Sequence, residues 1–348
     1  MVVILKIILA ILIFSVIIIF HEFGHFIFAK KCGVKVNEFC LGLGPTIFSW
    51  GKGETKYCLK LLPFGGACVM EGEEEESDSE RSFNKKSIWE RFQIIFAGPL
   101  FNFIMAFILS VVYIACIGVD LPTIDDVIDG YAAQEAGLES GDTIVALNGY
   151  HIHFYSEVRI YTFFHSGDTI DVTYLRDGER NTVTVEPRYS EDTGTYLIGI
   201  TNYGERTKLS PIRVLQYGLY EIKYEIYVTA QSLKMLFTGQ LSVNDVSGPV
   251  GVVTTISDVY DQSVSSGAFY VFINLTAIAI LLSANLGVMN LLPFPALDGG
   301  RILLLIIEAI RGKKIKPEIE NGINFAGFAL LMLLMVVVMY SDISKLIN

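Results

Sequence analysis

Apolar residues are concentrated in four long runs that contain no Asp, Glu, Lys or Arg. The runs are residues 7–20, 92–119, 262–297 and 322–340, and the first continues apolar to Ala29 apart from one polar cluster. A helix that spans a bilayer needs about 20 mostly apolar residues. The pattern therefore predicts a polytopic α-helical membrane protein with four transmembrane helices.

The placement of lysine and arginine predicts how the protein is oriented. Three lysines closely follow the first run, and four basic residues lie in the short connection 311–321. Basic residues are enriched in the loops on the cytoplasmic side of a membrane. We therefore expect the loop 31–91 and the connection 311–321 in the cytoplasm, and both termini and the long segment 120–261 outside.

These patterns divide the sequence into eight segments. Four contain the predicted transmembrane helices: 1–30, 92–119, 262–310 and 322–348, the last with a short tail. Two are cytoplasmic: 31–91, with strand-like elements, and 311–321. Two are extracytoplasmic: a folded domain at 120–200, and an amphipathic helix with a linker at 201–261.

Composition supports the membrane assignment and narrows the function. Of the 348 residues, 52% are hydrophobic and 18% are charged, against about 25% charged in an average soluble domain. These values exclude an ordinary cytosolic globule and a disordered protein. The net charge of −11 argues against a nucleic-acid partner.

Four of the five cysteines lie in the predicted cytoplasmic loop. Cys32, Cys40, Cys58 and Cys68 lack the C-x-x-C spacing of common zinc sites, so their pattern gives little support for a second zinc site. The predicted outside domain has no cysteine, so no disulfide framework is expected there.

The segment 120–200 has the signals of a small α+β domain. Thr143–Leu147 is a short apolar strand followed by the turn Asn148-Gly149, and alternating apolar positions around Asp177-Gly178 predict a second hairpin. The run AGLESGDTIVALNG resembles the core signature of bacterial PDZ domains. This resemblance implies an inserted domain that binds a peptide or the C-terminus of another protein as an added strand. A spacer domain that binds nothing is the alternative.

Residues 209–240 predict an amphipathic helix. Leu215, Leu219, Ile222 and Ile226 recur at helical spacing, and a proline suits the first turn. This helix either lies on the outer membrane surface or packs on the PDZ-like domain. The pattern of residues does not separate the two placements.

The polar cluster of the first run is the motif H-E-x-x-H. His21 and His25 are four residues apart, so on a helix they lie on one face and can bind one zinc ion, with Glu22 beside it as general base. Ionisable residues within a membrane helix are costly and are usually functional. The alternative is a polar cluster at the membrane interface.

The third run is interrupted by Asn285, Asn290, Pro293 and Pro295, and it ends at Asp298. Proline breaks a helix, and broken backbone at membrane depth needs protein or a cavity around it. We therefore predict that the third transmembrane helix is broken. Asp298 either needs a cationic partner, such as zinc, or caps a following helix at the water interface.

The expected depth of Asp298 in the membrane favours zinc as its partner over a capping role at the water interface. His21 lies about 21 Å along its helix from the start of the run, near the inner side of a core about 30 Å thick. The third run is expected to enter from outside, so Asp298 lies near its inner end as well. His21, His25 and Asp298 would then supply three ligands, and a catalytic zinc keeps a fourth position for water.

The two motifs together resemble a known family. H-E-F-G-H in the first run and N-L-L-P-F-P-A-L-D-G in the third are similar to those of the site-2 protease family of intramembrane zinc metalloproteases. The PDZ-like insert resembles the bacterial regulator-of-sigma-E protease branch. The resemblance implies His21, His25 and Asp298 as ligands of Zn²⁺ and Glu22 as the catalytic base. One departure from the family is that a single PDZ-like domain is present where some members have two.

The same resemblance implies residues that shape the site and bind substrate. They lie in the broken segment and in the cytoplasmic loop motif L-L-P-F-G-G, and they are Asn285, Asn290, Pro293, Pro295, Gly65 and Gly66. The loops of that family form strand-like elements that can pair with an unwound substrate.

The predicted function is hydrolysis of peptide bonds within transmembrane segments. The resemblance implies single-span membrane proteins as substrates, such as anti-sigma factors or signal-peptide remnants, in a bacterial plasma membrane with the active site near the cytoplasmic side. One alternative is a zinc-dependent transporter, which would need ligands spread along a pathway. The other is a non-catalytic PDZ scaffold, which would not need Glu22.

Overall fold

The computed structural model describes residues 2–51, 53–73, 77–191, 194–242 and 245–347. The protein divides into two compact units. One, here called the membrane unit, consists of residues 1–109 and 232–348, and the other, here called the inserted unit, consists of residues 110–231.

Four helices of the described residues are long and apolar enough to cross a membrane. They are α1 (Val2–Lys31), α2 (Ile88–Ile117), α7 (Ala268–Asn290) and α9 (Pro317–Ile347). Many large apolar side chains of these helices are exposed, among them Phe325 and Leu333 of α9. Exposing such apolar surfaces to water would be unfavourable, whereas exposing them to lipid tails would not. The prediction of four apolar helices of spanning length is confirmed.

Two shorter helices flank α7. Helix α6 (Pro249–Val264) precedes it, and α8 (Asp298–Arg311) follows it after the non-helical residues 291–297. Pro293 and Pro295 lie in this interruption, as expected for residues that cannot continue a helix. Whether α7 and α8 together form one broken membrane span remains a prediction.

The interruption folds back closely on the start of α8. A Cβ atom on Gly299 would lie 2.2 Å from the carbonyl oxygen of Leu292, and one on Gly300 would lie 2.2 Å from that of Phe294. No larger residue fits at either position without a shift of backbone. The glycine pair therefore determines how Asp298, the first residue of α8, is placed.

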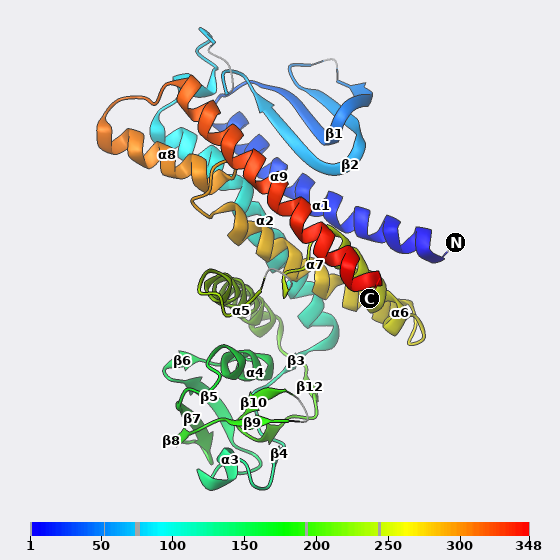
Figure 1. Cartoon of the computed structure of the whole chain (residues 1–348), viewed down its shortest axis with the longest axis vertical. Coiled ribbons are helices and arrows are strands. Elements are labelled where there is room, and N and C mark those ends of the chain that lie inside the picture. Colours follow the sequence, from blue (N-terminus) through cyan, green and yellow to red (C-terminus); the bar gives the residue numbers. More distant parts are fainter. Residues whose placement is uncertain (1, 52, 74–76, 192–193, 243–244, 348) are drawn as a thin grey trace. The chain divides into compact units, whose positions relative to one another are not determined.

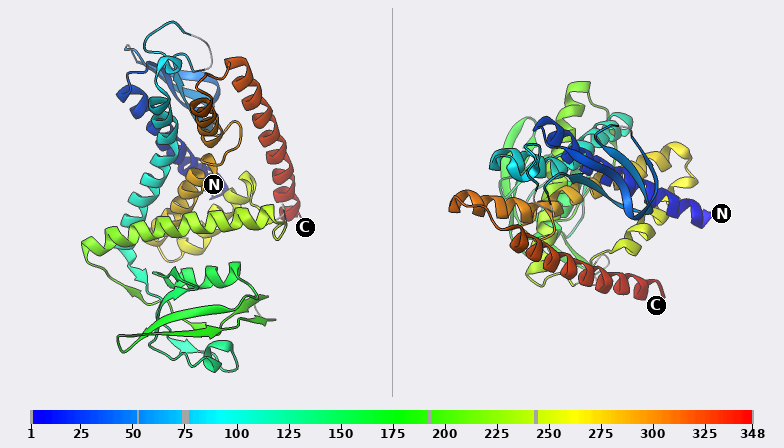
Figure 2. Two further views of the ribbon diagram at one scale, coloured as in Figure 1. Left: turned by 90° about the vertical axis from the view of Figure 1, so that its left-hand side faces the viewer. Right: turned by 90° about the horizontal axis from the view of Figure 1, so that it is seen from above.

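The loop between α1 and α2 folds into a curled hairpin of β1 (Val36–Trp50) and β2 (Lys56–Met70), followed by a short 3-10 helix at Phe83–Lys85. Residues 38–41 of β1 have partners in two stretches of β2, 56–59 and 66–69. The hairpin lies at the end of the membrane unit where α1 ends and α9 begins, and the start of α1 and the end of α9 lie at the other end (Figures 1 and 2).

A buried ion pair anchors the far end of α8. Arg91 at the start of α2 pairs with Glu308, and their side chains are 5% and 8% exposed. Removing one partner of such a pair leaves an uncompensated buried charge, which typically costs about 3–5 kcal/mol. The pair therefore fixes α8 against α2, so that α8 is held at both ends.

The inserted unit contains a four-stranded antiparallel sheet in the order β6-β5-β7-β8, accompanied by helices α3 and α4. Fully buried Ile144, Leu147, Ile170 and Val172 lie in its core. The strands of the sheet are β5 (Thr143–Leu147), β6 (Tyr150–His151), β7 (Ile170–Arg176) and β8 (Glu179–Val185), and the helices are α3 (Ala132–Glu135) and α4 (Tyr155–Phe164).

Three short antiparallel strand pairs also belong to the described part of this unit. They are β3 (Val119–Asp120) with β12 (Arg206–Thr207), β4 (Asp126–Val127) with β11 (Ile200–Thr201), and β9 (Arg188–Ser190) with β10 (Thr195–Leu197). The β3–β12 pair brings the two ends of the folded segment together.

The predicted amphipathic helix is α5 (Pro211–Phe237). Its first half belongs to the inserted unit and packs on the folded segment 120–200, because Val214 and Tyr217 are buried in one cluster with Phe154. The opposite side of this half exposes Leu215 and Leu219. Packing on the folded domain, one of the two predicted placements, is therefore observed, and a membrane-surface position is not tested.

Candidate active site

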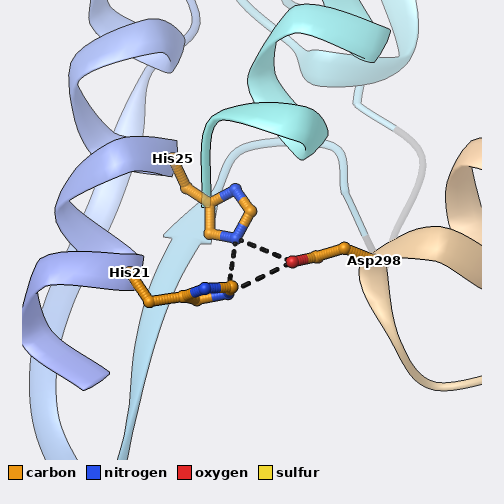
Figure 3. Close-up of side chains that lie close together, drawn as sticks. All are labelled: His21, His25 and Asp298. Carbon is orange, nitrogen blue, oxygen red and sulfur yellow. Dashed lines mark hydrogen bonds and ion pairs between the residues drawn. The ribbon is translucent and has the colours of Figure 1, made fainter. Parts of the chain in front are cut away.

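The residues of H-E-x-x-H and the aspartate of the third run meet in the membrane unit. Figure 3 shows His21 and His25, one turn apart on α1, pointing toward Asp298 at the first position of α8. The two imidazole Nε2 atoms are 3.2 Å apart, and Asp298 Oδ2 lies 3.1 Å from that of His21 and 3.4 Å from that of His25.

These distances fit a shared metal ion. A tetrahedral zinc with bonds of about 2.0–2.2 Å to nitrogen and oxygen separates its ligand atoms by about 3.3–3.6 Å. Both histidines are only 8% exposed. Two imidazole nitrogens and one carboxylate oxygen also form a donor set that is common at catalytic zinc sites.

The capping alternative for Asp298 does not account for its position. Asp298 lies in the first turn of α8, but no hydrogen bond from a side group caps the start of this helix. Its buried Oδ2 atom instead faces the Nε2 atoms of His21 and His25. A buried carboxylate oxygen needs a partner, and a cation held between it and the histidines would be one.

Glu22 lies in the same cavity as the three candidate ligands. The cavity has a volume of about 980 Å³, and its lining includes Glu22, Gly65, Gly66 and Asn290. Gly66 of β2 approaches Glu22 closely, since a Cβ atom there would lie 2.9 Å from Glu22 Cγ. The hairpin therefore covers the glutamate directly.

Not all predicted substrate-binding residues line this cavity. Asn285, Pro293 and Pro295 are absent from its lining, whereas their neighbours Leu286, Ala296 and Leu297 belong to it. Arg301, which sequence reasoning did not select, also lines it and forms an ion pair with Glu73. No local pattern marked this arginine, because its partner Glu73 is 228 positions away in the sequence.

Comparison with known proteins now decides the family. Residues 9–334 match the family described as Peptidase family M50. The protein belongs to this peptidase family.

Curated relatives match nearly the whole sequence. A Clostridium acetobutylicum protein named as a candidate zinc metalloprotease is 39% identical over 344 residues, which are 99% of this protein and 98% of that one. Zinc metalloprotease RasP of Bacillus licheniformis is 33% identical, with 97% and 98% covered. The regulator of sigma-W protease RasP of Bacillus subtilis is 31% identical, with 97% of both covered.

These findings confirm the predicted site-2 type of zinc metalloprotease, and they do not favour the transporter or the scaffold.

Two solved PDZ domains match about a quarter of this protein. The PDZ domain of an SdrC-like protein from Listeria innocua is 24% identical and covers 25% of this protein and 98% of its own length, with a TM-score of 0.23. The corresponding domain from Listeria monocytogenes has a TM-score of 0.20. Such scores do not decide the fold, so the PDZ-like nature of the inserted unit stays a prediction.

Helix α2 of this M50 peptidase orients both histidines. His25 Nδ1 lies 2.8 Å from the carbonyl oxygen of Ile94. A hydrogen bond from Nδ1–H to Ile94 leaves the Nε2 lone pair of His25 free to face a metal.

Asn102 of α2 is the corresponding partner of His21. Its fully buried amide Nδ2 lies 3.1 Å from His21 Nδ1. Its Oδ1 atom is buried without a hydrogen bond to the part of the protein that the structure describes. Turning the amide by 180° would let Oδ1 accept from His21 Nδ1–H and would leave Nε2 free. The signal in the sequence was a lone asparagine within a long apolar run.

Gly98 makes room for both imidazoles. A Cβ atom at this position would lie 2.3 Å from His25 Nε2 and 2.8 Å from His21 Cε1. Helix α2 therefore approaches the histidines with its bare backbone, and no other residue type fits there without moving them.

Gly98→Ala should displace the imidazoles, because its methyl group overlaps the metal-facing nitrogen of His25. We expect this variant to lose the zinc ion that His21 and His25 would bind, and to lose peptidase activity. Metal analysis of purified protein checks this. Gly322→Ala is the matched control, since Gly322 of α9 has no neighbour within 4 Å. Normal zinc in Gly98→Ala would contradict the packing argument.

Asn102→Ala should weaken zinc binding by about 10–100-fold, because His21 would lose the partner that fixes its tautomer. Competition with a chelator of known affinity measures this. Asn102→Asp should restore most of the affinity, since a carboxylate also accepts from Nδ1–H. Equal affinities for the wild type and the alanine variant would exclude the orienting role.

Proposed function

We propose that the zinc ion of this metalloprotease is bound by His21, His25 and Asp298, and that Glu22 is the general base. The spacing of the three ligand atoms, 3.1–3.4 Å, is the observation that carries the proposal. Glu22 follows the first ligand on the same helix and lines the same cavity, which is the relationship that H-E-x-x-H chemistry requires.

The chemistry is hydrolysis of a peptide bond. Bound zinc would polarise the scissile carbonyl and lower the pKa of a water molecule toward about 7. Glu22 would take a proton from that water and deliver it to the leaving amine. Asn290, at the end of α7 and in the cavity lining, would donate a hydrogen bond to the substrate backbone or to the developing oxyanion.

The substrates that we propose are transmembrane segments of single-span proteins. A helix hides its peptide groups, so a segment must unwind before it is cut. The stretch of β2 at Gly65 and Gly66 lines the cavity and would pair with an extended substrate. Asn285, Pro293 and Pro295 would act indirectly, by shaping the interruption between α7 and α8. A relative named as a regulator of sigma-W protease supports membrane-bound regulators, such as anti-sigma factors, as one substrate class.

The proposed setting is a bacterial plasma membrane. The basic residues after α1 and in 311–321 support a cytoplasmic position for the hairpin and the active site. Both termini and the inserted unit would then lie outside. The start of α1 and the end of α9 both point away from the hairpin (Figure 1), as this orientation requires.

The inserted unit is proposed to be a PDZ-like domain that controls access of substrate. A groove of about 710 Å³ lies between α4 and residues 195–201. Its lining includes Ile128, Val158 and Ile198. An apolar groove beside a strand edge suits an extended peptide or the C-terminus of another protein.

Glu22→Gln should retain zinc and lose at least about 100-fold in cleavage rate, because the amide cannot accept the proton. His21→Ala should lose both zinc and cleavage. The measurement is cleavage of a single-span substrate by purified protein in detergent, with metal content determined for each variant. Normal turnover by Glu22→Gln would overturn the mechanism.

Deletion of residues 121–205 tests the control of access. The cut leaves the β3–β12 pair, whose partners Asp120 and Arg206 lie side by side, so a short turn can join the ends. We expect the shortened protein to cleave a substrate whose bulky outside domain is intact, which the wild type leaves uncut. If the intact substrate stays uncut while a trimmed one is cleaved, the exclusion role is wrong.

A further inference from the structure

A second group of metal-ligating side chains lies in the β1–β2 hairpin. It consists of Glu38, Cys40 and Cys58, and one ligand atom of each lies within 4.8 Å of those of the other two. The two cysteines are 1% and 3% exposed, and Glu38 is half-buried. None of the three belongs to the cavity that contains Glu22.

The curl of the hairpin creates this group. Cys40 is paired with Cys58 across the strands, although the two are 18 positions apart. Glu38 lies two residues before Cys40, and side chains at this spacing project from the same face of a strand. Two stretches of backbone therefore converge on one point inside the hairpin.

The spacing matches that of a zinc site. The distance from Cys40 Sγ to Glu38 Oε2 is 3.6 Å. A tetrahedral zinc with bonds of about 2.3 Å to sulfur and 2.0–2.2 Å to oxygen places such a pair about 3.6 Å apart. Two thiolates and a carboxylate form a set that favours zinc over magnesium or calcium, because thiolates are soft ligands.

Charge also argues for a cation here. Buried cysteines often serve only as small apolar residues, but that role does not explain a carboxylate directed at them. Within the described ranges Glu38 forms no ion pair, and its carboxylate accepts a hydrogen bond from the thiol of Cys40. Lys60 lies close enough to favour the thiolate of Cys40. Its positive charge would offset the net negative charge of a zinc ion with two thiolates and one carboxylate.

We propose that Glu38, Cys40 and Cys58 bind a second zinc ion, with a water molecule as the fourth ligand. Binding would release two thiol protons and form two Zn–S bonds and one Zn–O bond, with no change of oxidation state. The proposal does not depend on the peptidase mechanism, because it uses none of the residues assigned to it.

A disulfide between the two cysteines is the competing use of the same geometry. A disulfide would remove the thiol hydrogen that Cys40 donates to Glu38, and it would leave this carboxylate beside sulfur atoms that carry no donor. A metal ion, by contrast, supplies the charge that deprotonates its ligands.

The ion would act as a clamp on the hairpin. It would tie residues 38–40 to residue 58, and the same stretch of β1 pairs on its other side with residues 66–69. The carbonyl oxygen of Cys40 lies 3.3 Å from the position of a Cβ atom on Gly66. The clamp therefore lies one strand away from the stretch that covers Glu22.

The test is metal analysis of the reduced, purified, full-length protein. We expect about two zinc ions per molecule in the wild type and about one in Cys40→Ser/Cys58→Ser. His21→Ala should also lose one ion, but from the other site. Cys32→Ser and Cys116→Ser are matched controls that remove a thiol outside the group and should keep both ions.

Cobalt spectroscopy on the wild-type protein tests the proposal without relying on a cysteine variant that folds. Co²⁺ bound to Cys40 and Cys58 should show thiolate-to-metal charge-transfer absorption, which a site of two histidines and one aspartate cannot produce. One zinc ion per molecule, or Co²⁺ spectra without this absorption, would overturn the proposal. So would a Cys40–Cys58 disulfide found under the same reducing conditions. Failure of the peptidase proposal would instead appear as cleavage by Glu22→Gln with the absorption unchanged.

Discussion

The buried carboxylate of Asp298, facing two imidazoles, is the constraint on which the membrane unit depends. Each of these groups would be costly to bury alone at membrane depth. Brought to within 3.1–3.4 Å of one another, they form a site that a divalent cation would stabilise. The interruption at residues 291–297 lets α8 begin with Asp298, opposite the two histidines of α1.

Close approach of backbones makes the same site possible. Gly98 lets α2 lie against both imidazoles, and Gly299 and Gly300 let the interruption fold onto α8. In a bilayer, apolar side chains gain little from leaving lipid, so tight packing of small residues contributes much of the helix association. The glycines near the site therefore combine two roles, since they bring the helices together and leave space for the ligands.

The hairpin adds what helices alone cannot provide. A substrate helix satisfies its own hydrogen bonds, and an unwound segment in a membrane needs new partners. Strand β2 passes beside Glu22 at Gly66, so backbone donors and acceptors lie next to the proposed base. A metal clamp at Cys40 and Cys58 would keep this strand in place while substrates of different sequence pass over it. The β1–β2 hairpin would then link the proposed zinc site at Cys40 and Cys58 to the proposed active site.

The spacing of residues close together in the sequence was enough to predict many of the elements and candidate site residues of this protein. The four apolar runs, the pairing of His21 with His25 one helical turn apart, and the helix-breaking prolines all depend on neighbours within a few residues, and such relations are visible in a sequence. Asp298 was joined to the histidines by an argument about depth and by the family resemblance, because it is far from them in the sequence. Partners that are distant in the sequence were not visible: Asn102 beside His21, Glu73 beside Arg301, and Cys58 beside Cys40. Only the tertiary structure decided these contacts, because the crossing of α1 with α2 and the curl of the hairpin are set by packing of whole elements, which no short pattern of residues encodes.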